Sequence, residues 1–299
     1  MVKYTHKNAF IAGKFAYYIT HLIRDSVMPK TYDKNKIKQR IMMLAVTVLC
    51  GIMAFLELAE ISLLVDEKRN EWLVKILQQT FGSLAVVLLL FSMRVKLFGR
   101  IDKWLYVLPC LVIAVNNFQW WAFFQGKMEL IRTNFADITL FTLQCLLIGL
   151  FEELVFRGAV FALVAGFFSK DKKGLIKAFV LSSVIFGLAH IFSGNFLQVG
   201  YTVLTGGLFA FVLLKTKNVL CSAVVHALYN FCGLLMDNLG TGAVFDVGTC
   251  VFMAIIAVIG ASIVLYGLYK YPEEERKELY IRLGVEGVSK TDTTSVENK

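Results

Sequence analysis

Two carboxylates and one guanidinium lie inside an otherwise apolar stretch that runs from Phe135 to Phe168, as Glu152, Glu153 and Arg157. On insertion scales, each charged side chain near the centre of a bilayer costs roughly 2.5 to 3.5 kcal/mol. Three such groups so close together need partners, water or a function to offset that cost. This cluster is therefore the first candidate for a functional site.

The spacing gives the two glutamates different roles. Side chains four positions apart share one face of a helix, so Glu153 and Arg157 can pair along one side. Glu152 points about 100° away from Glu153 and so stays clear of that pair. A carboxylate in a desolvated pocket without its own cation is suited to act as a general base toward water. We therefore expect Glu152 to activate water while Glu153 and Arg157 stay together.

Two later apolar segments carry polar side chains at the same helical spacing. His190 follows Phe186 by four residues, and Asn230 follows His226 by four residues. His226 and Asn230 can direct two hydrogen-bond donors at one point, the geometry that stabilises an oxyanion, and His190 can share the water or pass on its proton. A lone ion pair or a lone His-Asn face is often only structural. The three segments together predict one site for hydrolysis of an amide.

Other polar residues in the apolar stretches do not share this convergence. We interpret four of them as loop-end or packing groups: Asn116, Asn117, Asp137 and Gln144. The six cysteines are scattered through apolar runs with no CxxC pair, so we expect neither a zinc knuckle nor a disulfide framework. The expected chemistry rests on Glu152, Glu153, Arg157, His190, His226 and Asn230, with contact of one of the other four polar residues with substrate as the alternative.

The elements that position these residues are predicted to be membrane-spanning helices. The chain has 299 residues, of which 57% are hydrophobic, and its mean hydropathy is +0.65. These values exclude an ordinary soluble domain and predict an all-α, polytopic membrane helix bundle of about eight transmembrane helices. The expected spans are residues 41–65, 73–93, 104–124, 135–168, 178–192, 196–214, 219–236 and 249–269.

One of these spans, residues 135–168, is too long for a single perpendicular crossing. It would extend about 50 Å as a straight helix. We expect it to tilt, to break or to continue along the membrane interface, and Gly158 is the expected break. Small residues in the expected spans at 196–214 and 219–236 predict close helix packing rather than chemistry.

The charge of the chain predicts its orientation. The formal net charge is +9, but the lysines and arginines lie in the connections between apolar runs, which argues against nucleic acid as a partner. Cytoplasmic connections carry an excess of Lys and Arg, and the richest ones are residues 94–103, 170–177 and 215–217. Of the opposite connections, those at 193–195 and 237–248 have no Lys or Arg, whereas the other two hold Lys68, Arg69, Lys127 and Arg132. We predict that both ends are cytoplasmic, in a bacterial plasma membrane.

The chain is expected to divide into three parts. Residues 1–40 form a basic cytoplasmic arm, either an interfacial helix or a poorly ordered segment. Residues 41–270 form the transmembrane bundle, with the catalytic core at about 135–240. Residues 271–299 form a charged cytoplasmic tail that is partly disordered, with a short helix opening on Glu273, Glu274 and Glu275.

At its polar residues the sequence resembles the CPBP (CAAX protease and bacteriocin-processing) intramembrane proteases, also called the Abi family. Three motifs carry the resemblance in order: Glu-Glu-x-x-x-Arg at 152–157, Phe-x-x-x-His at 186–190 and His-x-x-x-Asn at 226–230. The resemblance implies a multi-helix fold in which Glu152 and His190 activate water. It also implies that His226 and Asn230 form the oxyanion hole, and that the Glu153–Arg157 pair organises the site.

The family has been described both as metalloproteases and as glutamate proteases. Two histidines and one glutamate could hold zinc with an open fourth position. However, the sequence has no HExxH motif, and Glu153 is expected to be committed to Arg157. A zinc site would then have to use Glu152, the best candidate base. The sequence favours no metal and no cofactor, with zinc as the alternative.

Other functions compete with proteolysis. Motifs of other intramembrane proteases, namely GxSG, HExxH and GxGD, are absent from the sequence. A membrane scaffold or a bacteriocin self-immunity protein could use the same cavity for binding only. A transporter could relay protons through the buried charges, although the sequence shows no internal repeat. The expected partners are a peptide or membrane-protein substrate and the lipid bilayer.

Overall fold

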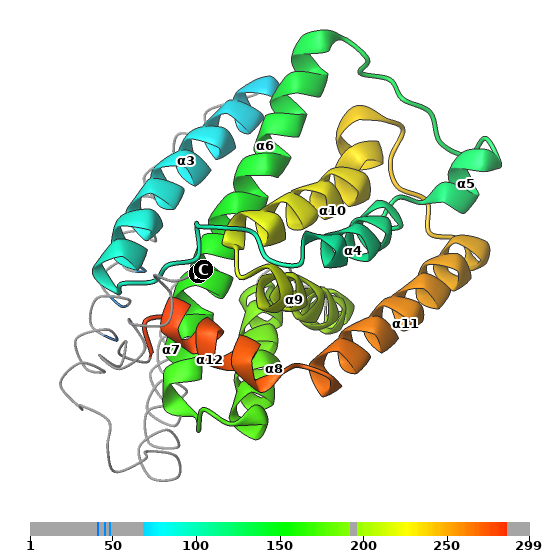
Figure 1. The fold of residues 1–299 in the computed structure, drawn as a ribbon. Coiled ribbons are helices and arrows are strands. Elements are labelled where there is room, and N and C mark those ends of the chain that lie inside the picture. Colours follow the sequence, from blue (N-terminus) through cyan, green and yellow to red (C-terminus); the bar gives the residue numbers. More distant parts are fainter. Residues whose placement is uncertain (1–40, 42–44, 46–47, 49–67, 192–195, 286–299) are drawn as a thin grey trace, which may run out of the picture.

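The computed structural model of the chain describes residues 41, 45, 48, 68–191 and 196–285. Their regular elements are all helical, with one isolated antiparallel bridge between Leu130 and Gly240 (Figure 1). The arm at 1–40, nearly all of the first expected span and the last part of the tail lie outside the described residues.

The described helices follow the expected spans in order, except that the expected span at 104–124 is divided. In chain order they are α3 (Lys68–Ser92), η1 (Trp104–Tyr106), α4 (Val107–Val115), α5 (Trp120–Phe124), α6 (Phe135–Glu153), η2 (Leu154–Val160), α7 (Phe161–Phe167), α8 (Lys172–Ala189), α9 (Phe196–Thr216), α10 (Val219–Leu239), α11 (Val247–Tyr269) and α12 (Glu273–Arg282).

Four of the described helices are long and apolar enough to cross a membrane. They are α3, the Val199–Thr216 part of α9, α10 and α11. The share of buried residues is highest in α9, which lies among the other helices in Figure 1. The fold is thus helical and suited to a membrane, while the count of eight spans and their orientation stay predictions.

The long expected span at 135–168 does not break at Gly158. Asn134 caps its start by accepting a hydrogen bond from the Asp137 amide at 2.9 Å. The segment then runs without interruption through α6, the π-helical turn η2 and α7. Gly158 serves close packing instead, because a Cβ there would lie 2.8 Å from Leu90 Cδ1 of α3. The irregularity in this long apolar segment is therefore the π-helical turn η2 and not a break.

The expected span at 104–124 is wrong as one continuous helix. It divides into α4 and α5, with non-helical residues between them. The Asn117 Nδ2 donates to the Tyr229 carbonyl of α10 at 2.9 Å, and its Oδ1 accepts from the Tyr201 hydroxyl of α9 at 2.5 Å. The Trp120 Nε1 donates to the Val115 carbonyl at 3.0 Å, which satisfies the end of α4. Asn117 is the packing group that the sequence predicted.

Helices α6 and α10 approach closely through a glycine. A Cβ on Gly149 would lie 2.8 Å from the Ala227 amide nitrogen and 2.9 Å from the Ala223 carbonyl oxygen. Helix α3 lies along α6 in Figure 1 and contacts it through Trp72 and Phe141, whose ring centroids are 6.2 Å apart. The residues of α6 and α10 that carry the expected chemistry are therefore held in a fixed relation.

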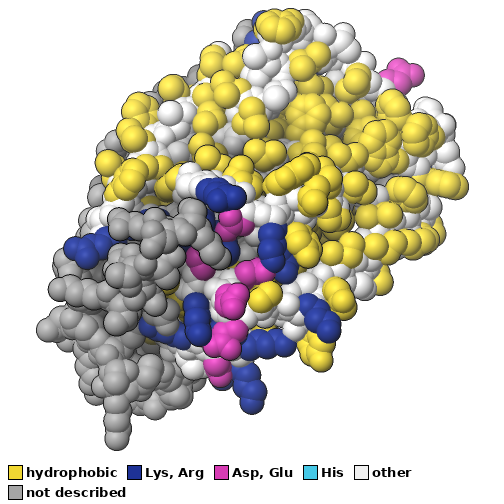
Figure 2. Space-filling view, in the orientation of Figure 1, with side chains coloured by type: hydrophobic (Ala, Val, Ile, Leu, Met, Phe, Trp, Pro, Cys, Tyr) yellow, Lys and Arg dark blue, Asp and Glu magenta, His cyan; other side chains and the backbone are white. Residues whose placement is uncertain are grey.

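The connections that the sequence identified as basic meet at one end of the bundle. This basic end consists of residues 93–103, 168–172 and 215–218 together with α12. The Val219 amide donates to the Leu97 carbonyl at 2.9 Å, and the Lys172 Nζ donates to the Tyr269 carbonyl at 2.6 Å. In Figure 2, charged side chains gather in this region, whereas most of the remaining visible surface is hydrophobic.

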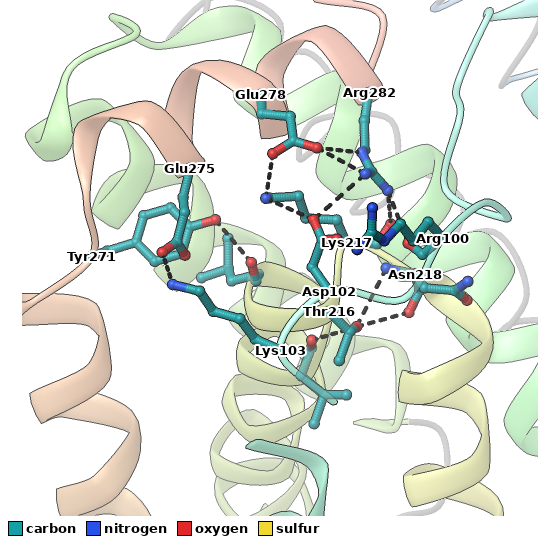
Figure 3. Close-up of polar contacts among 12 residues, drawn as sticks. Arg100, Asp102, Lys103, Thr216, Lys217, Asn218, Tyr271, Glu275, Glu278 and Arg282 are labelled. Carbon is teal, nitrogen blue, oxygen red and sulfur yellow. Dashed lines mark hydrogen bonds and ion pairs between the residues drawn. The ribbon is translucent and has the colours of Figure 1, made fainter. Parts of the chain in front are cut away.

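Helix α12 belongs to the bundle. It begins on Glu273 as expected, and its Leu279 and Tyr280 are fully buried against the core. Lys217 is buried as well, and it contacts Asp102 at 2.9 Å and Glu278 at 2.5 Å (Figure 3). Burial alone would raise the pKa of Asp102, but the hydrogen bond and charge of Lys217, with the charges of Arg282 and Arg100, lower it below its usual range. The tail up to residue 285 therefore packs as part of the fold.

Candidate active site

Glu153 is the most connected of the expected site residues. Its side chain is fully buried, and its carboxylate lies 3.1 Å from the Arg157 Nε. It also accepts a hydrogen bond from the Ser222 hydroxyl at 2.5 Å and lies 2.9 Å from the His226 Nδ1. The structure thus shows the expected pair with Arg157 and adds two partners from α10. A buried carboxylate with three such partners is stabilised in its ionised form.

Arg157 lies in the π-helical turn η2 and connects the pair to two further helices. Its Nη2 donates to the Gly206 carbonyl of α9 at 2.8 Å. Its guanidinium carbon lies 4.3 Å from the ring centroid of Phe186 on α8 and 5.5 Å from that of Phe209 on α9. A desolvated guanidinium is attracted to aromatic faces at such distances. Arg157 therefore holds α8 and α9 in place around Glu153.

His226 is oriented on both sides of its ring. The ring is stacked on Phe209, with centroids 4.3 Å apart and an interplanar angle of 18°. Because a carboxylate only accepts hydrogen bonds at this position, Nδ1 carries the proton that is donated to Glu153. The Nε2 then lies 3.7 Å from Oε2 of Glu152. Glu153, which the resemblance gives an organising role, thereby also fixes which nitrogen of His226 faces Glu152.

His190 reaches the same carboxylate from the end of α8. Its Nδ1 lies 2.9 Å from the Phe186 carbonyl oxygen, which can only accept, so Nδ1 donates and Nε2 is left as the acceptor in the neutral ring. That Nε2 lies 3.7 Å from Oε2 of Glu152. His190 is the C-cap of α8 and His226 lies within α10, yet the Nε2 atoms of both face the same carboxylate oxygen.

Glu152 contrasts with its neighbour Glu153. Its side chain is 22% exposed, and its Oε2 is a buried atom that accepts no hydrogen bond in the described part of the chain. Instead, Oε2 faces the Nε2 atoms of His190 and His226. A gap of 3.7 Å is too long for a direct hydrogen bond but suits a bridging water. The arrangement can therefore hold and deprotonate a water molecule.

Asn230 is the one expected site residue whose side chain forms no hydrogen bond or ion pair with the other five in the described part of the chain. It lies one turn after His226 on α10 and is half-buried. Its side chain makes no hydrogen bond to the residues that the structure describes. The structure thus brings five of the six expected residues together by measured distances, and it relates Asn230 to them by its place on the helix.

Three contributors were missed by the sequence analysis. Ser222 precedes His226 by four residues, so the helical spacing could have identified it as a member of the same face. The Gly206 carbonyl and the Phe209 ring gave no comparable signal, because their contribution arises from the packing of α9 against α8 and α10. Asp137, in contrast, lies as predicted at a loop end, where it contacts the Arg69 Nε at 2.5 Å.

A metal site needs several ligating side chains that converge on one point. Within the described residues, no group of three or more His, Cys, Asp and Glu side chains has the arrangement needed to hold a metal ion. Glu153 is already occupied by Arg157, Ser222 and His226. We therefore assign no step of the chemistry to a metal.

Residues 134–232 match the family model described as type II CAAX prenyl endopeptidase Rce1-like. The matched segment begins at the N-cap of α6 and includes all six expected site residues. The match confirms the resemblance noted in the sequence and suggests a CAAX-type intramembrane protease. No curated protein and no solved structure gives a significant match to the chain.

Proposed function

We propose that this protein is an intramembrane endopeptidase that hydrolyses a peptide bond in a membrane-associated peptide or protein, with Glu152 as the general base. The observation that carries the proposal is the Oε2 atom of Glu152, which is buried, accepts no hydrogen bond among the described residues and faces the Nε2 atoms of two histidines. The family match supports the reaction class. The proposed location is a bacterial plasma membrane.

The first step is activation of water. One water molecule can donate hydrogen bonds to Oε2 of Glu152 and Nε2 of His190 and accept one from Nε2 of a protonated His226, since each gap between the carboxylate and a ring nitrogen is 3.7 Å. Glu152 takes a proton from this water, and the oxygen attacks the carbonyl carbon of the scissile bond. The proton then passes to the amide nitrogen as the carbon–nitrogen bond breaks. His190 keeps the water in position through its Nε2.

The second requirement is stabilisation of the oxyanion. Because His226 Nδ1 donates to Glu153, the ring can donate from Nε2 when it is protonated. A protonated His226 with Arg157 would balance the charges of Glu152 and Glu153, so the whole group would be neutral in the apolar interior. Asn230 is proposed to supply the second donor from the next turn of α10. The Glu153–Arg157 pair acts by positioning His226.

The decisive experiment replaces the proposed base. Peptides of cells that express the wild-type chain are compared by mass spectrometry with those of cells that express Glu152→Gln. Loss of a general base lowers the rate by about 100-fold or more, so cleavage products should disappear while the amount of chain in the membrane stays normal. The matched control is Glu129→Gln, which removes an exposed carboxylate in the connection between α5 and α6.

The same comparison separates the alternatives. Unchanged products with Glu152→Gln would reject the protease and leave a scaffold or self-immunity protein that uses the cavity for binding. A transporter would lose flux without a change in peptide products. For the metal question, the purified protein is treated with a chelator. We expect cleavage to continue, and restoration of lost activity by zinc would contradict the proposed mechanism.

A further inference from the structure

A cleft of about 770 Å³ opens at the basic end, well apart in sequence from the catalytic residues. Among the described residues, its lining contains four cations and no carboxylate: Arg94, Lys96, Arg100 and Arg282. Phe91 and Phe98 supply apolar lining, and their rings stack with centroids 6.3 Å apart. The cleft therefore combines positive charge with an aromatic wall.

Three of these cations are available to a ligand. Arg94, Lys96 and Arg100 are exposed and form no ion pair with a carboxylate in the described part of the chain, although the charge of Arg100 interacts with that of Asp102. Arg282 differs, because its Nη2 lies 2.7 Å from Glu278 and 3.5 Å from Asp102. Figure 3 shows Arg100 beside this network. The cleft thus offers an anion the charges of Arg94 and Lys96, together with that of Arg100, which makes no ion pair but is partly balanced by Asp102.

The backbone that presents the three cations is held rigidly. The Lys96 amide donates to the Arg282 carbonyl at 2.7 Å, and the Arg282 Nη1 donates to the Arg100 carbonyl at 3.2 Å. Asn218 donates from Nδ2 to the Gly99 carbonyl at 2.7 Å. Arg94 has a φ of 57°, a left-handed conformation that is uncommon for a residue other than glycine. A site with its backbone already fixed loses less entropy when a ligand binds.

The position of the cleft identifies the class of anion. It follows directly after α3, a helix long and apolar enough to span a membrane. Phe91 near the end of that helix is 66% exposed, and Trp104 on the other side of the cleft loop is 58% exposed. Exposed aromatic residues at the end of a span are typical of the membrane interface. The cations are therefore expected at the depth of the lipid headgroups.

We propose that this cleft binds an anionic phospholipid, with Arg94, Lys96 and Arg100 on the headgroup phosphate and Phe91 and Phe98 against the upper part of an acyl chain. Arginine side chains bind phosphate through two parallel hydrogen bonds, and basic pockets beside membrane helices bind anionic headgroups. A soluble phosphate compound would use the same cations but not the aromatic wall. This binding site is independent of the proposed protease activity.

The test measures lipid binding to the full-length protein in detergent by native mass spectrometry. The probe is phosphatidylglycerol, with phosphatidylcholine as the neutral comparison. The test variant combines Arg94→Gln, Lys96→Gln and Arg100→Gln, all at exposed positions, and we expect about 100-fold weaker binding of phosphatidylglycerol. The control variant combines Lys173→Gln, Lys177→Gln and Lys270→Gln, which removes the same charge at the same end outside the cleft.

Two further arms complete the test. Phe91→Ser should weaken phosphatidylglycerol binding while the three cations stay in place, and it also serves as a second variant if the triple one does not fold. Glycerol phosphate, which has no acyl chain, should not displace the lipid. The proposal is overturned if the cleft and control variants bind phosphatidylglycerol equally well, if phosphatidylcholine binds as tightly, or if glycerol phosphate competes fully.

Discussion

Two adjacent glutamates in one helix have opposite environments, and this difference carries the proposed chemistry. Glu153 is fully buried and is stabilised by Arg157, Ser222 and His226. Glu152 is partly exposed, lies near two imidazole nitrogens and forms no ion pair with a Lys or Arg among the described residues. The first arrangement favours an ionised carboxylate that does not react. The second leaves a carboxylate that can exchange a proton with water.

The difference predicts opposite effects on stability from the same chemical change. Glu153→Gln leaves the Arg157 charge buried without its partner, and removal of one partner of a buried ion pair costs about 3 to 5 kcal/mol. Glu152→Gln breaks no such pair, so the unfolding free energy should stay close to that of the wild type. Denaturant unfolding of both purified variants checks this. Equal losses of stability would contradict the assigned environments.

At the residue scale, the spacing of polar residues along a helix predicted those parts of the site that lie within one helix. The Glu153–Arg157 pair depends only on positions within one helix, so the sequence contains the whole of it. The approach of His190 to Glu152 depends on how α8 packs in the bundle, which no local pattern encodes. For the same reason the ring of Phe209, which lies against His226, could not be predicted.

At the scale of elements, the π-helical turn places Arg157 within the site. The turn begins directly after Glu153 and includes Arg157 and Gly158. π-Helical turns occur mostly as single insertions in α-helices and are frequent at functional sites. The periodicity of apolar residues cannot reveal such a turn, because the chain is helical both before it and after it. The sequence therefore predicted the irregularity but assigned a break at Gly158.

The close packing of α6 on α10 makes a testable prediction about Gly149. A Cβ at this position would lie 2.8 Å from the Ala227 amide nitrogen, and the backbone of α10 cannot yield as a flexible side chain would. Gly149→Ala should therefore move His226 away from Glu152. We expect a loss of about 1 to 3 kcal/mol in unfolding free energy together with a loss of proteolysis.

The matched control for this variant is Gly200→Ala in α9. Nothing lies within 4 Å of a Cβ at Gly200, so the substitution meets open space. Alanine is favoured over glycine in a helix by about 0.5 to 1 kcal/mol, and stability should be unchanged or slightly higher. A Gly149→Ala protein as stable and active as the Gly200→Ala protein would show that the α6–α10 contact does not position the site.

At the scale of the whole molecule, the tail helix and the basic connections form one unit. Buried Lys217 contacts Asp102 and Glu278, so a single ammonium joins the connection after α3 to α12. The sequence indicated that Lys217 belongs to a basic connection, but it could not show that this lysine is buried. Composition predicts which connections are positive, whereas their assembly into one end depends on the order and direction of the helices.

This assembly makes the orientation testable with two single cysteines. The basic end contains the connections richest in Lys and Arg, and such connections remain in the cytoplasm. Lys173 lies in the first turn of α8 at that end, and Phe245 lies in the exposed connection between α10 and α11 at the other. Each position is changed, as Lys173→Cys or Phe245→Cys, in a chain whose six native cysteines have been replaced. With a membrane-impermeant maleimide, intact cells should label the Phe245→Cys protein. The Lys173→Cys protein should react only after the membrane is opened. The reverse pattern would place the basic end outside and would remove the cytoplasmic leaflet as the source of lipid for the cleft.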